Sequence, residues 1–110
     1  MTDGDEIKVP QINAQQLKEM LESATPPFLL DVREQWEVAQ GMIPGARHIP
    51  MNSIPKRFDE VPRDQTVVVY CAAGVRSDTV AAYLLQIGYA KVLNLDGGIG
   101  AWEQLRHKRS

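Results

Sequence analysis

The sequence has one cysteine, Cys71, among its 110 residues. A single cysteine excludes an internal disulfide and a metal site built from several cysteines, so any thiol that reacts with Cys71 must come from another molecule. No apolar run is long enough to span a bilayer. Residues 1–6 are acidic and polar and lack the basic and apolar regions of a signal peptide. We therefore expect a cytoplasmic location and no membrane as a partner.

The sequence also lacks an excess of charge of one sign, because 12 basic residues face 14 acidic ones and the formal net charge is −2. Such a balance gives no field that would favour nucleic acid as a partner. Its two histidines, His48 and His107, are far apart in the sequence, and we expect each to be hydrogen-bonded or exposed and neither to bind a metal. A Ser-His-Asp order, an HExxH motif and the glycine pattern of a nucleoside-triphosphate loop are missing too.

What remains is an ordinary globular composition, 44% hydrophobic and 24% charged, in a length that suits one domain, 1–110. Strand-like and helix-like segments alternate, which predicts an α/β fold with a mostly parallel sheet. We expect strands at 9–12, 28–32, 47–50, 66–70 and 91–95. We expect helices between Asn13 and Thr25, from 52 or 53 to 58, at 76–87 and at 99–105, and one helical turn within 33–39. Residues 1–8 and 106–110 are expected to be flexible ends.

The most informative stretch runs from Val67 to Ser77. An apolar, β-branched strand pattern ends in Cys71, small residues follow, and Arg76 opens a helix pattern. Ligands of open α/β sheets bind at the carboxyl ends of strands, and loop amides, a helix N-terminus and an arginine all favour an anion there. Such surroundings lower a cysteine pKa from ~8.5 into the range ~3.5–7.5 and so produce a nucleophilic thiolate. On the residues alone, an inert buried cysteine is an equal alternative.

Charged and aromatic residues beside this stretch allow two interpretations each. Asp31, inside an apolar strand, needs a partner, and we expect it to belong to a structural hydrogen-bond network. Arg33 either belongs to the same network or lies at the pocket rim and binds donor anions. Trp36 could form a wall of the pocket, but the pattern favours a core position for it and for Trp102.

Four segments together resemble the rhodanese homology domain, and the resemblance covers nearly the whole chain. Residues 29–34 look like its D-V-R-E motif, and residues 41–50 like its G-H-I-P-G-A-x-N/H-I-P motif. Residues 69–77 resemble its active-site loop C-x-x-G-x-R-S, and residues 95–102 its closing L-x-G-G-x-x-A-W motif. Four motifs in this order make the match specific. The resemblance implies a three-layer fold, with about five mostly parallel strands and helices on both faces.

The same resemblance implies a sulfurtransferase. In the family, the active-site cysteine takes the outer sulfur of thiosulfate or another sulfane-sulfur donor, and the resulting persulfide passes it to cyanide or a thiol. The resemblance assigns the nucleophile to Cys71 and implies no metal or organic cofactor. From the residues themselves we expect the substrate to be bound by Ala72, Ala73, Gly74, Val75, Arg76 and, in its donor-binding interpretation, Arg33. We expect Asp31 and Ser77 to give structural support. Because Cys71 has no second cysteine beside it, a sulfur-relay protein is expected as a further partner.

The loop from Cys71 to Arg76 has six residues. Cell-cycle phosphatases and arsenate reductases on this fold use a loop one residue longer, which encloses a tetrahedral oxyanion, so loop length disfavours both activities. A non-catalytic sulfur-relay or protein-docking module is the main alternative to an enzyme. Two features bear on the choice of donor: Met42 stands where the family has a histidine, and Arg76 is the one cation of the loop.

Overall fold

The computed structural model describes residues 7–107 of the chain. Five strands form one sheet in the order β1-β5-β4-β2-β3, and each neighbouring pair is parallel. The strands are β1 (Gln11–Ile12), β2 (Phe28–Asp31), β3 (Arg47–His48), β4 (Val67–Tyr70) and β5 (Val92–Leu95). The predicted α/β fold with a mostly parallel sheet is confirmed.

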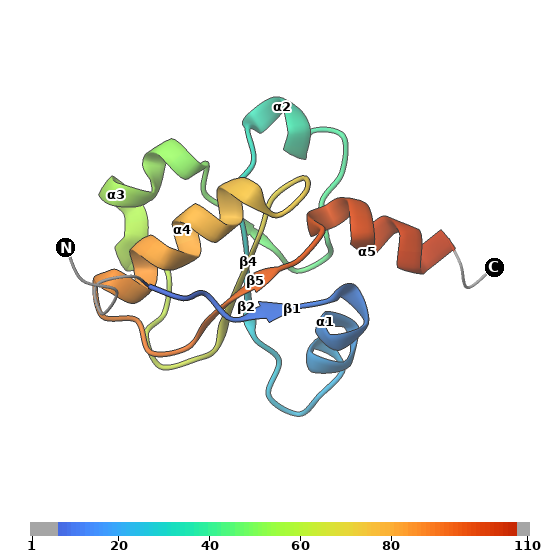
Figure 1. The fold of residues 1–110 in the computed structure, drawn as a ribbon. Coiled ribbons are helices and arrows are strands. Elements are labelled where there is room, and N and C mark those ends of the chain that lie inside the picture. Colours follow the sequence, from blue (N-terminus) through green and yellow to red (C-terminus); the bar gives the residue numbers. More distant parts are fainter. Residues whose placement is uncertain (1–6, 108–110) are drawn as a thin grey trace.

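Helices cover both faces of this sheet (Figure 1). α3 and α4 lie on one face, α1 and α5 lie on the other, and α2 lies beyond the carboxyl ends of the strands. The helices are α1 (Ala14–Leu21), α2 (Gln35–Val38), α3 (Ile54–Arg57), α4 (Val75–Gln86) and α5 (Gly98–His107), and the 3-10 helices η2 (Met51–Ser53) and η3 (Phe58–Glu60) flank α3. This arrangement is the three-layer fold that the resemblance implies.

Strand β4 contributes to two apolar cores, one on each face of the sheet. Val67 and Val69 pack in the α4 core, whereas Val68 and Tyr70 pack in the α1–α5 core. All four are 0% exposed. Successive side chains of a strand point to opposite faces, so a central parallel strand that is covered on both faces is apolar throughout. Full burial of one valine contributes about 1.5–3 kcal/mol, and the strand therefore holds the following Cys71 in a fixed place.

Local capping sets where two of the helices begin. Asn13 caps α1 through a reciprocal pair with Gln16: each side-chain oxygen accepts from the other residue's backbone N–H at 2.8 Å. α4 begins at Val75, one residue earlier than predicted, because Gly74 adopts φ +106° and turns the chain into the helix.

Two expectations from the sequence are wrong. Trp36 is 66% exposed and not in the core, because the four-residue α2 buries none of its residues. α5 continues through Arg106 and His107, two residues beyond the predicted end of the last helix at Leu105. Trp102 is buried, as predicted. Residues 1–6 and 108–110 of the expected flexible ends lie outside the described residues. Within residues 7–107, no helix has the length and apolar character needed to cross a membrane.

Candidate active site

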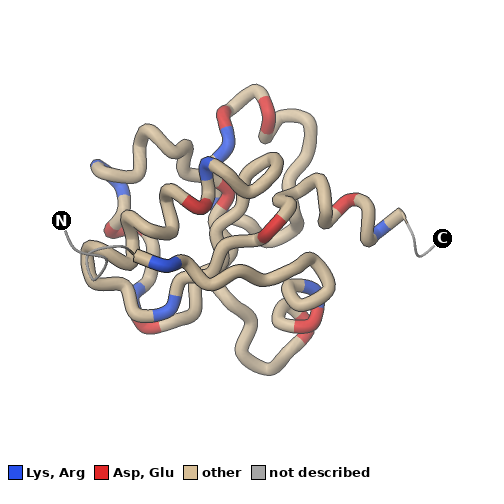
Figure 2. Tube along the Cα trace, viewed as in Figure 1, with Lys and Arg blue, Asp and Glu red and all other residues tan. Residues whose placement is uncertain are grey.

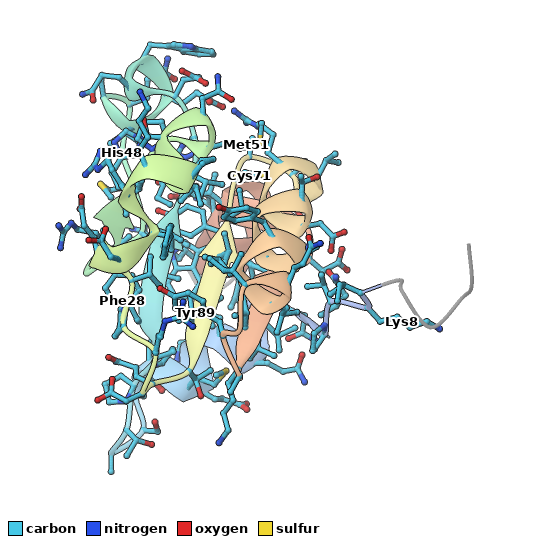
Figure 3. The ribbon with its side chains drawn as sticks, turned by 90° about the vertical axis from the view of Figure 1, so that its left-hand side faces the viewer. Lys8, Phe28, His48, Met51, Cys71 and Tyr89 are labelled. Carbon is cyan, nitrogen blue, oxygen red and sulfur yellow. The ribbon has the colours of Figure 1, made fainter. Side chains whose placement is uncertain are left out.

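Cys71 directly follows β4, at the edge of the sheet where the carboxyl ends of the parallel strands meet. The loop after it leads into α4, whose first turn lies beside the sulfur (Figure 3). The backbone N–H groups of Gly74 and Ser77 donate to Sγ over 3.2 and 3.4 Å, and the Ser77 hydroxyl lies 3.3 Å from it. These groups form a cradle for a negatively charged sulfur. The sequence predicted a cradle of the amides of residues 72–76, and the structure adds the amide of Ser77 to it.

Two effects oppose each other in setting the pKa of Cys71. Burial is the largest single effect and raises the pKa, because the residue is 1% exposed and a thiolate loses hydration there. The Ser77 hydroxyl, whose one hydrogen can be donated either to the sulfur or to Asn94, and the amides of Ser77, Gly74 and Ala73 favour the thiolate. Together they outweigh burial, so the pKa of Cys71 is lowered. This favours a nucleophilic cysteine over an inert one.

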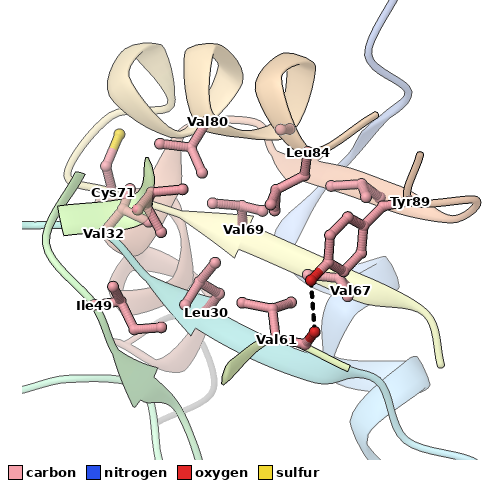
Figure 4. Close-up of a cluster of buried hydrophobic side chains, with 13 residues drawn as sticks. Leu30, Val32, Ile49, Val61, Val67, Val69, Cys71, Val80, Leu84 and Tyr89 are labelled. Atoms are coloured by element: carbon pink, nitrogen blue, oxygen red, sulfur yellow. Dashed lines mark hydrogen bonds between the residues drawn. The ribbon is translucent and has the colours of Figure 1, made fainter. Parts of the chain in front are cut away.

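The sulfur of Cys71 lies at the boundary between the apolar core and polar groups. Its side chain belongs to the core cluster on the α4 face, with Val32 and Val80. Figure 4 shows Sγ at the edge of this cluster, turned away from Leu30 and Val69 and toward the start of α4. The apolar side chains fix the position of the Cβ atom, while the loop provides the hydrogen bonds to the sulfur.

Arg76 reaches the site from the first turn of α4, but its charge is shared with a carboxylate. It donates two hydrogen bonds to Glu37 of α2, at 2.7 and 2.9 Å, and the two side chains are 32% and 12% exposed. The hydrogen bond from Arg76 is the largest cause that lowers the pKa of Glu37 to about 2, and the same bond raises the pKa of Arg76. The nearby Cys71 sulfur is a smaller cause of the raised pKa of Arg76.

Asp31 and Arg33 form a buried ion pair at the same edge of the sheet. Arg33 donates through Nε to both carboxylate oxygens at 3.1 Å, and through a terminal nitrogen to Asp31 at 2.8 Å and to the Gly41 carbonyl at 2.7 Å. The side chain of Arg33 is 6% exposed and that of Asp31 is 0% exposed. The Arg33 guanidinium lies 5.7 Å from the centroid of the Tyr70 ring. Because Arg33 directs these donors at the protein itself, its placement favours the structural interpretation over donor binding.

Asn94 of β5 binds the loop through its side-chain amide. This residue is 2% exposed, and its amide nitrogen donates to the Gly74 carbonyl at 3.1 Å and to the side chain of Gln11 at 2.9 Å. Its side-chain oxygen accepts from the Ser77 hydroxyl. The amide thus joins β1, the loop and the first turn of α4.

The start of α5 supports the loop from the other side. The amides of Ile99 and Gly100 donate to the carbonyls of Cys71 and Ala72 at 2.9 and 3.2 Å. Gly98 has φ +58°, and a Cβ atom there would clash with the same two carbonyl oxygens. The backbones therefore approach as closely as they do only because residue 98 is glycine.

The other predicted residues lie around the cradle. Ala73 and Val75 are exposed at the surface of the loop, and Ala72 and Met42 are half-buried. The ring of His48 makes a 2.7 Å hydrogen bond with the Arg33 carbonyl, in line with the expected hydrogen-bonded histidine. Among residues 7–107, no cluster of three or more His, Cys, Asp or Glu side chains could hold a metal ion.

Glu37 and Asn94 were not among the site residues predicted from the sequence. Glu37 is 39 positions from Arg76, and no local pattern reveals a pair at that separation. A signal for Asn94 was available, because it is a polar residue inside an otherwise apolar strand, and a buried amide needs partners.

The family model of the rhodanese-like domain matches residues 13–105. The chain belongs to the rhodanese-like domain family. This rhodanese-like chain is 48% identical over 94 residues to a protein named sulfurtransferase from Allochromatium vinosum. The aligned residues cover 86% of this chain and 88% of that protein. It is 32% identical over 94 residues to the putative sulfur carrier protein YrkF of Bacillus subtilis, over 86% of this chain and 51% of that protein. The crystal structure of a rhodanese-like domain protein from Staphylococcus aureus superimposes with a TM-score of 0.81 at 36% identity, over 86% and 91% of the two chains.

Proposed function

We propose that this chain is a sulfurtransferase in which Cys71 carries sulfane sulfur as a persulfide. The observation that carries the proposal is the pair of hydrogen bonds that the amides of Gly74 and Ser77 donate to Sγ, together with the Ser77 hydroxyl that lies beside the sulfur. These bonds favour a thiolate despite its burial. A relative named sulfurtransferase, 48% identical, supports the same chemistry.

Loading of the cysteine is a nucleophilic displacement at sulfur. With thiosulfate as donor, the Cys71 thiolate forms a bond to the outer sulfur. The bond between that sulfur and the sulfonate sulfur breaks, and sulfite leaves with the electron pair. The negative charge then resides on the outer sulfur of the persulfide, and amides like those of Gly74 and Ser77, which donate to Sγ, favour a negative charge on sulfur.

Unloading reverses the roles. A thiophilic acceptor, cyanide or a thiolate, attacks the outer sulfur, the sulfur–sulfur bond of the persulfide breaks, and the Cys71 thiolate is regenerated. Both steps move a sulfur atom without net oxidation or reduction, so they balance without a redox cofactor. The hydrogen bonds that stabilise the thiolate as nucleophile also stabilise it as leaving group, and the same cradle therefore serves both steps.

The second candidate is a sulfur-relay module that receives and passes on sulfur but turns over thiosulfate poorly. The relative named putative sulfur carrier protein favours it. In that case Cys71 still forms a persulfide, and the acceptor is a protein thiol. Phosphatase or arsenate reductase activity is disfavoured by the six-residue loop from Cys71 to Arg76.

Thiocyanate production from thiosulfate and cyanide tests the proposal, with the Cys71→Ser variant as the matched control. Serine preserves the size and hydrogen bonding of the side chain but cannot form a persulfide. We expect turnover in the wild type and none above the uncatalysed rate in the variant. Turnover that is equal in the two proteins contradicts the proposal. A single stoichiometric transfer without turnover identifies the relay module.

A further inference from the structure

The side chain of Gln11 binds the support of the Cys71 loop from an edge strand. Gln11 lies in β1, opposite Asn94 of β5 in the parallel register. Its Oε1 accepts from the Asn94 side-chain nitrogen at 2.9 Å. Its Nε2 donates to the Val9 carbonyl at 3.1 Å and to the Asp78 carboxylate at 2.8 Å. Both ends of this exposed amide are therefore used, one toward the surface and one toward the site.

The groups around Gln11 allow its amide one orientation. A carbonyl and a carboxylate accept hydrogen bonds and do not donate them, so the nitrogen of Gln11 must face Val9 and Asp78. The oxygen of Gln11 then faces Asn94, which must present its own nitrogen. The Gly74 carbonyl accepts from the same nitrogen of Asn94 at 3.1 Å and requires the same orientation.

The orientation of Asn94 decides which groups compete for the one hydrogen of the Ser77 hydroxyl. Because Asn94 turns its nitrogen away from Ser77, its oxygen faces the hydroxyl and accepts that hydrogen. The Ser77 oxygen, 3.3 Å from the Cys71 sulfur, then serves as an acceptor for the thiol. In the reverse orientation, the nitrogen of Asn94 would donate to Ser77 and leave the hydroxyl hydrogen to the sulfur.

This competition affects the reactivity of the thiolate. A thiolate that receives fewer hydrogen bonds is more basic, and a more basic thiolate is the stronger nucleophile. The backbone amides of Gly74 and Ser77 donate to the sulfur in either orientation of Asn94. The amides therefore keep Cys71 ionisable, while Asn94 limits how far the hydroxyl weakens it as a nucleophile.

We propose that Gln11 is a positioning residue of the site: it holds Asn94 in the orientation that competes for the Ser77 hydrogen, and so sets the nucleophilic strength of Cys71. As a role in sulfur transfer, this inference rests on the proposed function. Gln11 touches no reacting atom and acts through two side chains, Asn94 and Ser77, that connect it to the sulfur.

The charged groups beside Cys71 belong to a different set of contacts. Arg76 is paired with Glu37 at 2.7 Å, and Figure 2 shows positive and negative positions side by side around α2 and the start of α4. The side chain of Gln11 binds the carboxylate of Asp78 instead. A neutral substitution at position 11 therefore leaves the charges around the sulfur in place.

The Gln11→Leu variant tests this role, because leucine is neutral and can neither donate nor accept. The backbone bonds between β1 and β5 do not involve the Gln11 side chain, so the variant keeps its fold. With Asn94 held less firmly, the Ser77 hydrogen turns to the sulfur more often. The inflection of iodoacetamide alkylation against pH should therefore fall by about half a pKa unit. The rate above the inflection should fall about 1.6-fold, since nucleophilicity decreases with pKa.

A merely structural role of Gln11 gives a different profile. A loosened loop would raise the alkylation rate at high pH through better access and leave the inflection in place. That result, or an unchanged profile, overturns the inference. Gln15→Leu is the matched control, because it removes another exposed glutamine, one that donates to Glu19 of α1 at 3.1 Å. Both features of its profile should equal those of the wild type.

A double-mutant cycle tests the route through Asn94. In the Asn94→Ala background, Gln11→Leu should not move the inflection further, because the residue through which it acts is gone. A shift of the same size in both backgrounds overturns the inference. Alkylation requires no sulfur donor, so the two proposals fail separately. Shifts in a protein that no donor loads support the role of Gln11 and refute the proposed function, whereas a loaded protein without the shifts refutes the role of Gln11 alone.

Discussion

The Ser77 hydroxyl donates its hydrogen to the side-chain oxygen of Asn94 while it lies 3.3 Å from the Cys71 sulfur. A hydroxyl has one hydrogen to donate. When Cys71 is a thiol, its S–H can donate to the Ser77 oxygen, and both contacts are satisfied. When Cys71 is a thiolate, the sulfur and the Asn94 oxygen compete for that one hydrogen. The pKa of Cys71 thus depends on both neighbours.

Replacing Ser77 with alanine should raise the pKa of Cys71 by about one to two units, because a hydrogen bond to a charged group contributes about 1.5–3 kcal/mol and the amide of residue 77 stays in place. The rate of alkylation by iodoacetamide measures the thiolate. It should be high above the pKa of Cys71 and fall as the pH decreases through that value. In the wild type the inflection should lie below the ~8.5 of a free cysteine. Ser53→Ala, where the hydroxyl makes no capping hydrogen bond, is the control. The same inflection in the Ser77 variant and the wild type would refute this role.

Replacing Asn94 should move the same inflection in two directions. Asn94→Ala removes the competing acceptor, so the Ser77 hydrogen is available to the sulfur and the pKa of Cys71 should fall. Asn94→Asp adds a buried negative charge near the thiolate, so the pKa should rise. Both variants should lower the free energy of unfolding by about 1–3 kcal/mol, because the Gly74 carbonyl loses a buried partner. Shifts in the same direction in both variants would contradict the competition.

Gly98→Ala should destabilise the protein by about 3 kcal/mol or more in urea denaturation, because the new Cβ atom meets the carbonyls of Cys71 and Ala72 at a positive φ. Gly45→Ala is the matched control. Gly45 has φ +88° but has no heavy atom within 4 Å of an added Cβ, so it should show only the conformational cost of about 1–2 kcal/mol. Equal losses in the two variants would mean that the close approach of α5 to the loop contributes nothing to stability.

Arg33→Met should separate the structural interpretation of Arg33 from donor binding. The variant leaves Asp31 buried without its partner, so the free energy of unfolding should fall by about 3–5 kcal/mol. KM for thiosulfate, measured where the variant is folded, should not change. Arg106→Met, which removes an exposed partner of Glu103, should change stability by less than about 0.5 kcal/mol. A large rise in KM with unchanged stability would identify Arg33 as a donor-binding residue.

Much of the fold could be predicted because its local signals agree. The apolar run Val67–Tyr70, the cap at Asn13 and the helical spacing of Val80 and Leu84 each point to the element that the structure contains. Trp36 could not be placed from such signals. Whether an aromatic residue beside one helical turn faces the core depends on the packing of that turn, and α2 packs too little to bury it.

Only those residues of the candidate site that are close together in the sequence could be predicted. Cys71, Gly74, Arg76 and Ser77 lie in one loop, and spacing alone brings their groups together. The partners that decide the charge of the site come from elsewhere. Glu37 reaches Arg76 from α2, and pairs between distant segments leave no trace in a single sequence.

The most direct test of the account is the intact mass of the protein after incubation with thiosulfate and, separately, with glutathione persulfide. Because Cys71 is the one cysteine, a gain of one sulfur atom can be assigned to it without ambiguity. We predict this gain in the wild type with at least one donor, its removal by cyanide, and its absence in Cys71→Ser. A wild-type mass that stays unchanged with both donors, or an equal gain in Cys71→Ser, would contradict the central claim that Cys71 carries sulfur as a persulfide.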